Sequence, residues 1–566
     1  MILAALVLFV LIISAAYFVK KISATRQDAD PESYFGLTAD TSAGLDAAEE
    51  GELAVIIDGE IITARALNIG GFYYISRETA ETYVDERLYY GEEDEILLLT
   101  NAVSTYKTYT GESTYTLDGE ETDLGHVLVA ESSGTVYISL EYLKIFSNLE
   151  YETFEEPDRI FITTETGEFE YTETAGGIRI RTGAYKTAGI LARTEEGEEL
   201  RILETAEDGD WVRVISESGW VGYIASAAVS EIYTKTVAGN YTDPEYTSLS
   251  ADADIIIGFA ALYKASANSS YSSITENAAG TMNVYCPLWY SLSDEDDCFE
   301  SISDSRYTAL AHADGCLVWA VFTDTDGSTG ENYGDDVLRS YEKRQQIIDA
   351  VMADMEANDI DGLNMDFEQI SSEYSEDYLQ FLRELSARCR AAGKYFTADN
   401  YAPYEYNDTI FSITEQNDLC DYVIIMAYDD YVGGDEAGPN SSTPFLEEVL
   451  ELSLDKIDAG KLVVVLPFYT RFWYETDGEL TNSAFSIESS WEELSENAVT
   501  AEWDDELDLY YVSYEDEGST VYAWLENEET ISSKLSVLSG YSIAGTGFWR
   551  LGWGTSEIWK IIDEYY

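Results

Sequence analysis

The chain has 566 residues, of which 109 are acidic and 31 are basic, so its formal charge is −78 at neutral pH. This length predicts three or four domains, one of which could be large enough to form a barrel. The electrostatic field of this negative charge repels phosphate backbones, so no nucleic-acid partner is expected. Hydrophobic residues make up 45% of the chain, which is ample for packed cores.

Histidine and cysteine usage narrows the possible chemistry. The chain contains two histidines, His126 and His312, in different regions, which excludes a histidine-rich zinc site. Its five cysteines are odd in number and include no Cys-x-x-Cys pair. They are therefore predicted to be buried free thiols rather than metal ligands or a full set of disulfides.

The chain opens with an uncharged, apolar run at residues 2–19, long enough for one membrane span of about 20 residues. Residues 1–21 are predicted to be a membrane anchor, with a cleaved signal peptide as the alternative. Residues 22–52 are rich in small and polar side chains and are predicted to be a linker. The rest of the chain is then expected at the outer face of the cell envelope, or secreted if the segment is cleaved.

A β-rich region follows at residues 53–166, where alternating runs such as GELAVIIDGEIITA are separated by Gly and Asp turns. Its final part, GTVYISLEYLKIFSNLEYETFEEPDRIFITT, resembles the copper amine oxidase N-terminal-like domain. That resemblance carries no catalytic motif and implies no copper.

Residues 177–232 are predicted to form a second small β domain, because short strands are joined by hairpin signals such as Ser218-Gly219. An Arg-x-Gly stretch opens the region, a Gly-Asp-Trp strand follows, and Gly-Trp-x-Gly-Tyr closes it. The pattern resembles bacterial SH3-type domains. The resemblance implies a domain that binds cell-wall peptides, with a simple spacer as the alternative.

From residue 251 to 566, eight apolar, strand-like runs alternate with helical periodicity: IIIGFAALY, MNVYCPLWY, CLVWAVF, IDGLNMDFE, KYFTADN, YVIIMAY, KLVVVLPFY and AGTGFWRL. This alternation predicts an α/β fold, a (β/α)8 TIM barrel, preceded by the small all-β domains and the membrane segment. The longest insertion, at about residues 470–535, is expected between the seventh and eighth strands.

The fourth run, IDGLNMDFE, contains the candidate catalytic residues. Alternation along a strand places Asn364, Asp366 and Glu368 on one face, which would line the barrel, while the apolar residues between them pack outward. Parallel barrel strands are usually hydrophobic throughout, and buried carboxylates are disfavoured unless they have a function. These polar side chains at the carboxyl end of a strand therefore indicate an active site.

Two carboxylates on one strand, about 6 to 7 Å apart along the backbone, cannot easily flank a sugar ring. Most glycosidases place an acid and a second carboxylate on opposite faces of the ring. This pair can supply an acid and a helper, so the nucleophile must come from elsewhere. An N-acetyl group on the sugar can provide it, because its amide oxygen can attack the anomeric carbon and form an oxazolinium ion.

Three motifs then resemble glycoside hydrolase family 18, the chitinases and related N-acetylglucosaminidases. Residues 361–368 are similar to the D-x-x-D-x-D-x-E signature, with Asn364 where Asp is commonest. Residues 426–429 (MAYD) resemble the Met-x-Tyr-Asp motif, and Trp549 resembles the tryptophan that floors the sugar site. Accompanying phrases such as MNVYCPLWYSLS are most similar to the spore-cortex-lytic branch, whose members cleave peptidoglycan at N-acetylglucosamine.

The resemblance implies a role for each matching residue. Glu368 would be the general acid and then the base that activates water, Asp366 would orient the acetamide and stabilise the cation, and Tyr428 would bond the acetamide oxygen. Sugar-binding positions are expected at Asn364, Asp429, Met426, Trp549, Trp289, Phe259 and Tyr469. Asp361 and His312 are interpreted as structural, and no metal or organic cofactor is needed.

These observations predict retaining, substrate-assisted hydrolysis of N-acetylglucosamine bonds, with peptidoglycan or a chitin-like glycan as the partner. Two alternatives stay open at this point. One is a chitinase that acts on foreign chitin, and the other is a non-catalytic protein that binds cell-wall glycan. The retained Glu368 favours an enzyme, because inactive barrels of this family typically lack the acid.

Overall fold

The structure is a computed structural model that describes residues 25–39, 49, 51–207, 209–251, 253–293, 298–325, 330–433, 436–516 and 518–566. It divides into two compact units, with the boundary between Asp243 and Pro244 and with the short segments Gly91–Glu95 and Thr100–Thr105 in the second unit. The predicted membrane anchor lies outside the described residues. Within the described ranges, no helix has both the length and the apolarity that a membrane span requires.

The first unit contains a seven-stranded sheet in the order β11-β12-β1-β2-β3-β10-β9, with helices α3 and α4. Strands β1 and β2 form a hairpin at Asp58-Gly59, where both residues have positive φ (48° and 95°), as a tight two-residue turn requires. The bounds are β1 (Glu52–Ile57), β2 (Glu60–Ile69), β3 (Phe72–Ser76), α3 (Arg77–Tyr83), β9 (Val129–Ser132), β10 (Thr135–Ser139), α4 (Leu140–Leu143), β11 (Glu150–Phe154) and β12 (Arg159–Thr163).

A smaller sheet, in the order β4-β5-β6-β7-β8, is formed by residues that lie between β3 and β9 along the chain. Its strands are β4 (Leu88–Gly91), β5 (Ile96–Thr100), β6 (Thr105–Tyr109), β7 (Thr114–Leu117) and β8 (Glu120–Asp123). The region predicted as β-rich at 53–166 is therefore mainly strand, with two short helices.

A second seven-stranded sheet of the same unit has the order β15-β14-β18-β17-β16-β13-β19. Its outer strands lie beyond the predicted boundaries of 177 and 232, because β13 pairs with both β16 and β19. The bounds are β13 (Gly167–Ala175), β14 (Arg179–Arg181), β15 (Ile190–Arg193), β16 (Glu196–Thr205), β17 (Trp211–Ser216), β18 (Val221–Ala225), the 3-10 turn η1 (Ser226–Ala228) and β19 (Ile232–Val237).

Part of the predicted linker is folded against these sheets, which corrects the prediction for residues 22–52. Helix α2 (Pro31–Tyr34) leads into Phe35, which is buried in one cluster with Ala54 and Ile56 of the first sheet and Val221 of the second. Upstream, the Ala29 N–H donates to the backbone of the second sheet at 2.8 Å. Phe35 and the residues beside it therefore belong to a core that the two β regions share, although most of the predicted linker is small or polar.

The second unit is a closed barrel, and all eight predicted strands are confirmed. The parallel strands follow the order β20-β33-β27-β26-β25-β24-β23-β21, and β20 pairs with β21 to close the ring; the short antiparallel β22 adds to the edge of β21. The bounds are β20 (Ile255–Ala260), β21 (Val284–Leu292), β22 (Phe299–Ser301), β23 (Leu317–Thr323), β24 (Gly362–Asp366), β25 (Tyr395–Asn400), β26 (Tyr422–Met426), β27 (Leu462–Pro467) and β33 (Gly545–Trp549).

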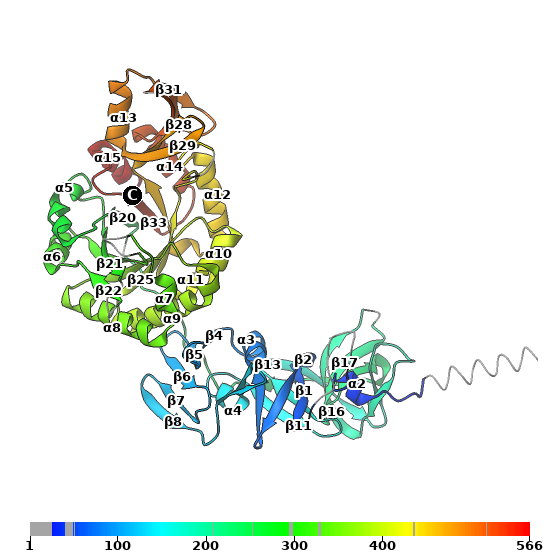
Figure 1. Cartoon of the computed structure of the whole chain (residues 1–566). Helices are drawn as coiled ribbons and strands as arrows, with labels where there is room; N and C mark the ends of the chain where they lie inside the picture. Colours follow the sequence, from blue (N-terminus) through cyan, green and yellow to red (C-terminus); the bar gives the residue numbers. More distant parts are fainter. Residues whose placement is uncertain are drawn as a thin grey trace, which may run out of the picture. The chain divides into compact units, whose positions relative to one another are not determined.

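Helices surround these strands (Figure 1). Helix α8 buries Ile347, Ile348, Val351 and Met355 on one stripe, as the helical spacing predicts. The helices and 3-10 turns are η2 (Ala265–Ser270), α5 (Tyr271–Thr275), α6 (Ser305–Ala313), α7 (Gly334–Leu338), α8 (Tyr341–Ala357), η3 (Ser372–Tyr374), α9 (Ser375–Ala392), α10 (Glu405–Phe411), α11 (Ile413–Leu419), α12 (Thr443–Leu454), η4 (Ala459–Lys461), α14 (Glu528–Leu538) and α15 (Ser556–Tyr565).

The predicted insertion between the seventh and eighth barrel strands is a separate five-stranded sheet in the order β29-β28-β32-β31-β30, covered by helix α13. It begins directly after β27 and ends just before α14. Its elements are β28 (Tyr469–Thr476), β29 (Glu479–Ser486), α13 (Ile487–Glu496), β30 (Glu502–Asp504), β31 (Leu509–Asp516) and β32 (Ser519–Leu525).

Candidate active site

Strand β24 positions the predicted acidic pair. Leu363 and Met365 are buried in the core between the strands and the helices, so Asn364 and Asp366 face the barrel interior, as alternation predicts. The strand starts with Gly362 because its neighbours leave no room for a side chain. A Cβ there would lie 2.6 Å from the Trp319 ring.

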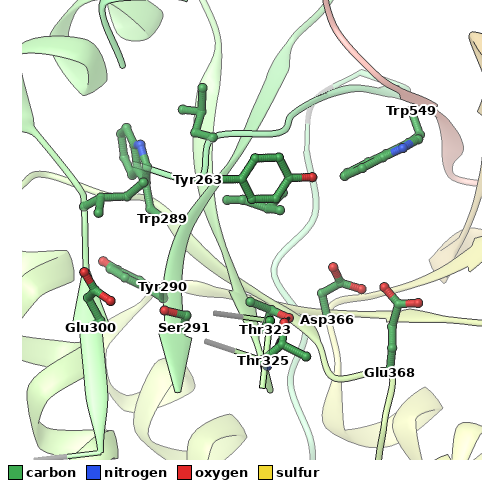
Figure 2. A pocket seen from close by; sticks show the side chains of 14 residues that line it. Tyr263, Trp289, Tyr290, Ser291, Glu300, Thr323, Thr325, Asp366, Glu368 and Trp549 are labelled. Carbon is green, nitrogen blue, oxygen red and sulfur yellow. Dashed lines mark hydrogen bonds between the residues drawn. The ribbon is translucent and has the colours of Figure 1, made fainter. Parts of the chain in front are cut away.

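A cavity of about 310 Å³ opens at the carboxyl ends of the barrel strands, and Asp366, Glu368 and Trp549 line it. Figure 2 shows the carboxyl groups of Asp366 and Glu368 side by side, both pointing into the cavity toward Trp549. Asp366 is almost fully buried, whereas the end of Glu368 is exposed in the cavity. The barrel therefore presents one shielded and one accessible carboxyl group at the carboxyl end of β24.

Strand β25 backs this pair. Thr397 Oγ1 donates to Asn364 Oδ1 at 2.6 Å, and Asn364 Nδ2 donates to Asp399 Oδ2 at 2.7 Å. Just past the strand, the Tyr401 hydroxyl donates to Glu368 Oε2. Asn364 of β24 and Glu368 just past it are thus each bonded by polar side chains from β25 or from the residue that follows it.

The site concentrates negative charge away from water. Burial raises the pKa of Asp366 well above its usual range, and the carboxyl groups of Glu368, Asp399 and Asp324 raise it further. Asp324, directly after β23, is buried, and this burial raises its pKa to about 6, even though it accepts the Gln369 N–H at 2.7 Å. Partial loss of water raises the pKa of Glu368, an effect that its bond from Tyr401 opposes. All of these shifts favour the protonated form, so the site favours a proton among its carboxyl groups.

The MAYD motif lies at the end of β26. Asp429 accepts hydrogen bonds from Tyr469 Oη at 2.6 Å and from the Arg471 guanidinium, and its own backbone N–H donates to Asn440 Oδ1 at 3.1 Å. Tyr428 is partly buried, with its ring centroid 6.0 Å from that of Tyr469. The first strand of the insertion thus supplies two of the groups that hold Asp429.

Three aromatic residues expected to offer open faces to a sugar are instead buried. Trp289 is 1% exposed and donates its indole N–H to Asn268 Oδ1 at 2.7 Å, so its ring is fixed within the wall. Phe259 is 3% exposed and packs inside the barrel, and Tyr469 is 4% exposed. Met426 is also buried. Trp289 nevertheless lines the cavity, whereas Phe259, Tyr469 and Met426 do not line it. Position at a strand end does not reveal how deeply a side chain is buried.

Trp549 does line the cavity, and Tyr263 joins it. Tyr263 lies after β20 with 59% of its surface exposed, and Figure 2 shows its ring near that of Trp549. Aromatic faces of this kind stack on sugars. The sequence run IIIGFAALY includes Tyr263, but Phe259 of the same run was predicted instead, from its place near the strand end.

The polar residues of the site that the sequence did not reveal include Asp324, Asp399 and Tyr401. The run KYFTADN carries a signal, because Thr397 and Asp399 alternate with apolar residues in a buried strand in the same way as Asn364 and Asp366. At the opposite end of the barrel, His312 Nε2 contacts Asp361 Oδ2 at 2.8 Å, away from the cavity. Across the described ranges, no group of three or more His, Cys, Asp or Glu side chains could hold a metal ion, and all five cysteines are buried.

Comparison with known proteins extends these observations. Residues 220–553, more than half of the chain, match the glycosyl hydrolases family 18. The chain belongs to glycosyl hydrolase family 18. It is therefore a glycoside hydrolase, and the family motifs fall on the strands around the cavity.

Two curated relatives of this family member come from Bacillus subtilis. The chain is 24% identical to the uncharacterized glycosylase YvbX over 266 residues, which are 44% of this chain and 74% of that protein. It is 22% identical to the cortical fragment-lytic enzyme over 279 residues, 47% of this chain and 62% of the relative. The chain spans 56% of the length of the first curated relative.

Among solved structures, the Bacillus cereus spore cortex-lytic enzyme SleL matches with a TM-score of 0.50 and 19% identity. The match covers 59% of this chain and 79% of that structure. At this identity the likeness concerns the fold, and it agrees with the barrel of the second unit.

Proposed function

We propose that this family 18 hydrolase cleaves N-acetylglucosamine glycosidic bonds with retention, using the substrate's own acetamide as the nucleophile. The observation that carries the proposal is the placement of Asp366 and Glu368, which enter the cavity side by side from one strand. Such a pair can protonate a leaving oxygen and stabilise a cation, but it cannot attack the opposite face of the ring.

Each residue then has a distinct role. Glu368, exposed in the cavity, donates a proton to the leaving oxygen and afterwards accepts one from water. Asp366 accepts the acetamide N–H and stabilises the positive oxazolinium, which a buried carboxylate does more strongly than an exposed one. Tyr428 donates to the acetamide oxygen, Asp429 supports this network, and Trp549 and Tyr263 stack on the sugars.

Peptidoglycan is the substrate we propose. The names of two relatives, a cortical fragment-lytic enzyme and a spore cortex-lytic enzyme, support a cell-wall glycan. Hydrolysis of chitin by the same site is the competing outcome, because both polymers contain N-acetylglucosamine.

The test is a digestion of purified peptidoglycan and of chitin oligomers, followed by mass spectrometry of the products after borohydride reduction. We expect fragments whose new reducing ends are N-acetylglucosamine, and proton NMR of the first product should show the β-anomer that retention requires. Faster cleavage of chitin would reassign the substrate. An initial α-anomer would rule out the acetamide mechanism.

We also propose how the remaining regions serve this activity. The sheet that includes β14 to β18 supports an SH3-type domain that binds wall peptides, and the first sheet supports the copper amine oxidase N-terminal-like resemblance. The apolar run at 2–19 supports an anchor that holds the enzyme at the outer face of the membrane.

Exchange of Tyr401 for Phe should shift the pH dependence of cleavage. The Tyr401 hydroxyl donates to Glu368 and favours its ionised form, so removing it should raise the pKa of Glu368. The acid then stays protonated to higher pH, and the alkaline limb of the kcat/KM profile should move to higher pH. Tyr404→Phe is the matched control, because that hydroxyl bonds Glu448 instead. An alkaline limb that stays in place in Tyr401→Phe would contradict this assignment.

A further inference from the structure

The inward-facing residues of β24 and β25 form three levels. The strands are parallel, and their register pairs Asn364 with Thr397 and Met365 with Ala398, so the next level brings Asp366 beside Asp399. Neighbouring strands lie about 4.8 Å apart, which places equivalent side chains in contact range. The level beyond contains Glu368 and Tyr401.

The lower and upper levels are each closed by a hydrogen bond from a hydroxyl group. Thr397 donates to Asn364, and Tyr401 donates to Glu368. The middle level has no such donor among the described residues: Asp366 Oδ1 and Asp399 Oδ1 are both buried without a hydrogen-bond partner. Two buried oxygens left in this way on adjacent side chains need an explanation, because an unpaired buried oxygen is costly.

We propose that Asp366 and Asp399 hold one proton between them, and that Asp399 thereby acts as a positioning residue for Asp366. A proton on one Oδ1 would donate to the other and satisfy both atoms at once. Asn364 fixes one side of Asp399, because its amide donates to Asp399 Oδ2 at 2.7 Å, and the other oxygen, Oδ1, is left for the shared proton.

The surrounding charges favour the shared proton. Burial raises the pKa of both carboxyl groups, and further carboxyl groups add repulsion. The titratable groups that face the pair from the packed elements are Glu368 and Tyr401 beyond β24 and β25, Asp324 after β23, Cys286 on β21, Tyr428 after β26 and Tyr378 on α9. All of them are acids, so loss of the proton would add a second negative charge to an already negative site.

The shared proton would have one consequence for catalysis, and this consequence alone rests on the proposed function. When Asp366 accepts the acetamide N–H, the shared proton can reside on Asp399 and donate to Asp366 Oδ1. Asp366 then stays ionised and fixed toward the sugar, while the proton remains within the pair. The family signature usually has Asp at the position of Asn364. In this chain, Asp399 of the next strand would supply the missing carboxyl group.

The test is the pH dependence of thermal stability, which needs no substrate and so stands apart from any failure of the proposed function. Unfolded aspartates release their protons near pH 4, whereas the folded pair keeps one to higher pH. Because the folded parent then binds one more proton than the unfolded chain, its stability should fall as pH rises. Asp399→Asn removes that proton but keeps a side-chain oxygen that accepts the hydrogen bond from Asn364. The Tm of the variant minus the Tm of the parent should therefore increase steadily from pH 5 to pH 8.

Thr397→Val is the matched control, because it removes a polar group of the same face without removing a carboxyl group. Its Tm offset from the parent should be constant over the same pH range. Asp366→Asn provides a second variant if Asp399→Asn does not fold, and it should show the same rising difference. A Tm difference that does not change with pH in the folded carboxyl variant would overturn the shared proton.

Discussion

Replacing Glu368 with Gln should lower kcat for glycan cleavage about 10²- to 10⁴-fold, the contribution that a positioned general acid usually makes. The amide has nearly the same shape as the carboxyl group and can still accept the Tyr401 hydroxyl, but it cannot protonate the leaving oxygen. Release of reducing sugar from peptidoglycan or chitin oligomers measures the effect. Unchanged Tm and retained binding of a chitin oligomer would show that the variant is folded.

Glu300→Gln is the informative companion variant. Glu300 lines the same cavity, and Figure 2 shows it on the side away from Asp366 and Glu368. If the acetamide is the nucleophile, this exchange should leave the rate near that of the parent. A loss in Glu300→Gln as large as that in Glu368→Gln would instead indicate a second catalytic carboxylate, and a Glu368→Gln variant as fast as the parent would remove the general acid from the proposal.

Replacing Lys534 with Met should lower the free energy of unfolding by about 3–5 kcal/mol, because it leaves a buried carboxylate without its cation. Lys534 on α14 donates to both oxygens of Glu526 at 2.8 Å, and both side chains are at most 1% exposed. Glu526 directly follows β32, so the ion pair ties the end of the insertion to a barrel helix. Urea unfolding followed by circular dichroism measures the change.

Lys560→Met tests whether burial is the cause. Its partner Glu557 and Lys560 itself are largely exposed, and such pairs contribute about 0–1 kcal/mol. The double variant Lys534→Met with Glu526→Leu should recover much of the lost free energy of unfolding, because it leaves no unpaired charge in the buried site. Equal losses in Lys534→Met and Lys560→Met would contradict the assignment.

The barrel could be predicted because its strands are buried on both faces and therefore read as uninterrupted apolar runs. Asp366 and Glu368 were found for the same reason, as polar exceptions inside such a run. Asp399 is an equally clear exception in its own strand, but no motif drew attention to it. Asp324 lies after its strand ends, where alternation no longer indicates which way a side chain points.

The burial of individual aromatic side chains could not be predicted from the strand pattern. Trp289 was expected at a strand end like Trp549, but it lies within β21 and its indole N–H donates to Asn268, so it lines the cavity with only 1% of its surface exposed. The same limit applies to Phe35 of the predicted linker, because its partners come from two different sheets. Contacts between distant segments determine these positions, and local composition does not report them.

The attachment of the insertion constrains how this enzyme can change over evolutionary time. Tyr469 and Arg471, on the first strand after the seventh barrel strand, both bond the carboxylate of Asp429. A lineage that deleted the insertion in one genetic event would therefore also strip this carboxylate of two donors. Shortening the sheet from its far edge, where β30 pairs with β31, would leave those bonds intact and is the route by which descendants could trim it.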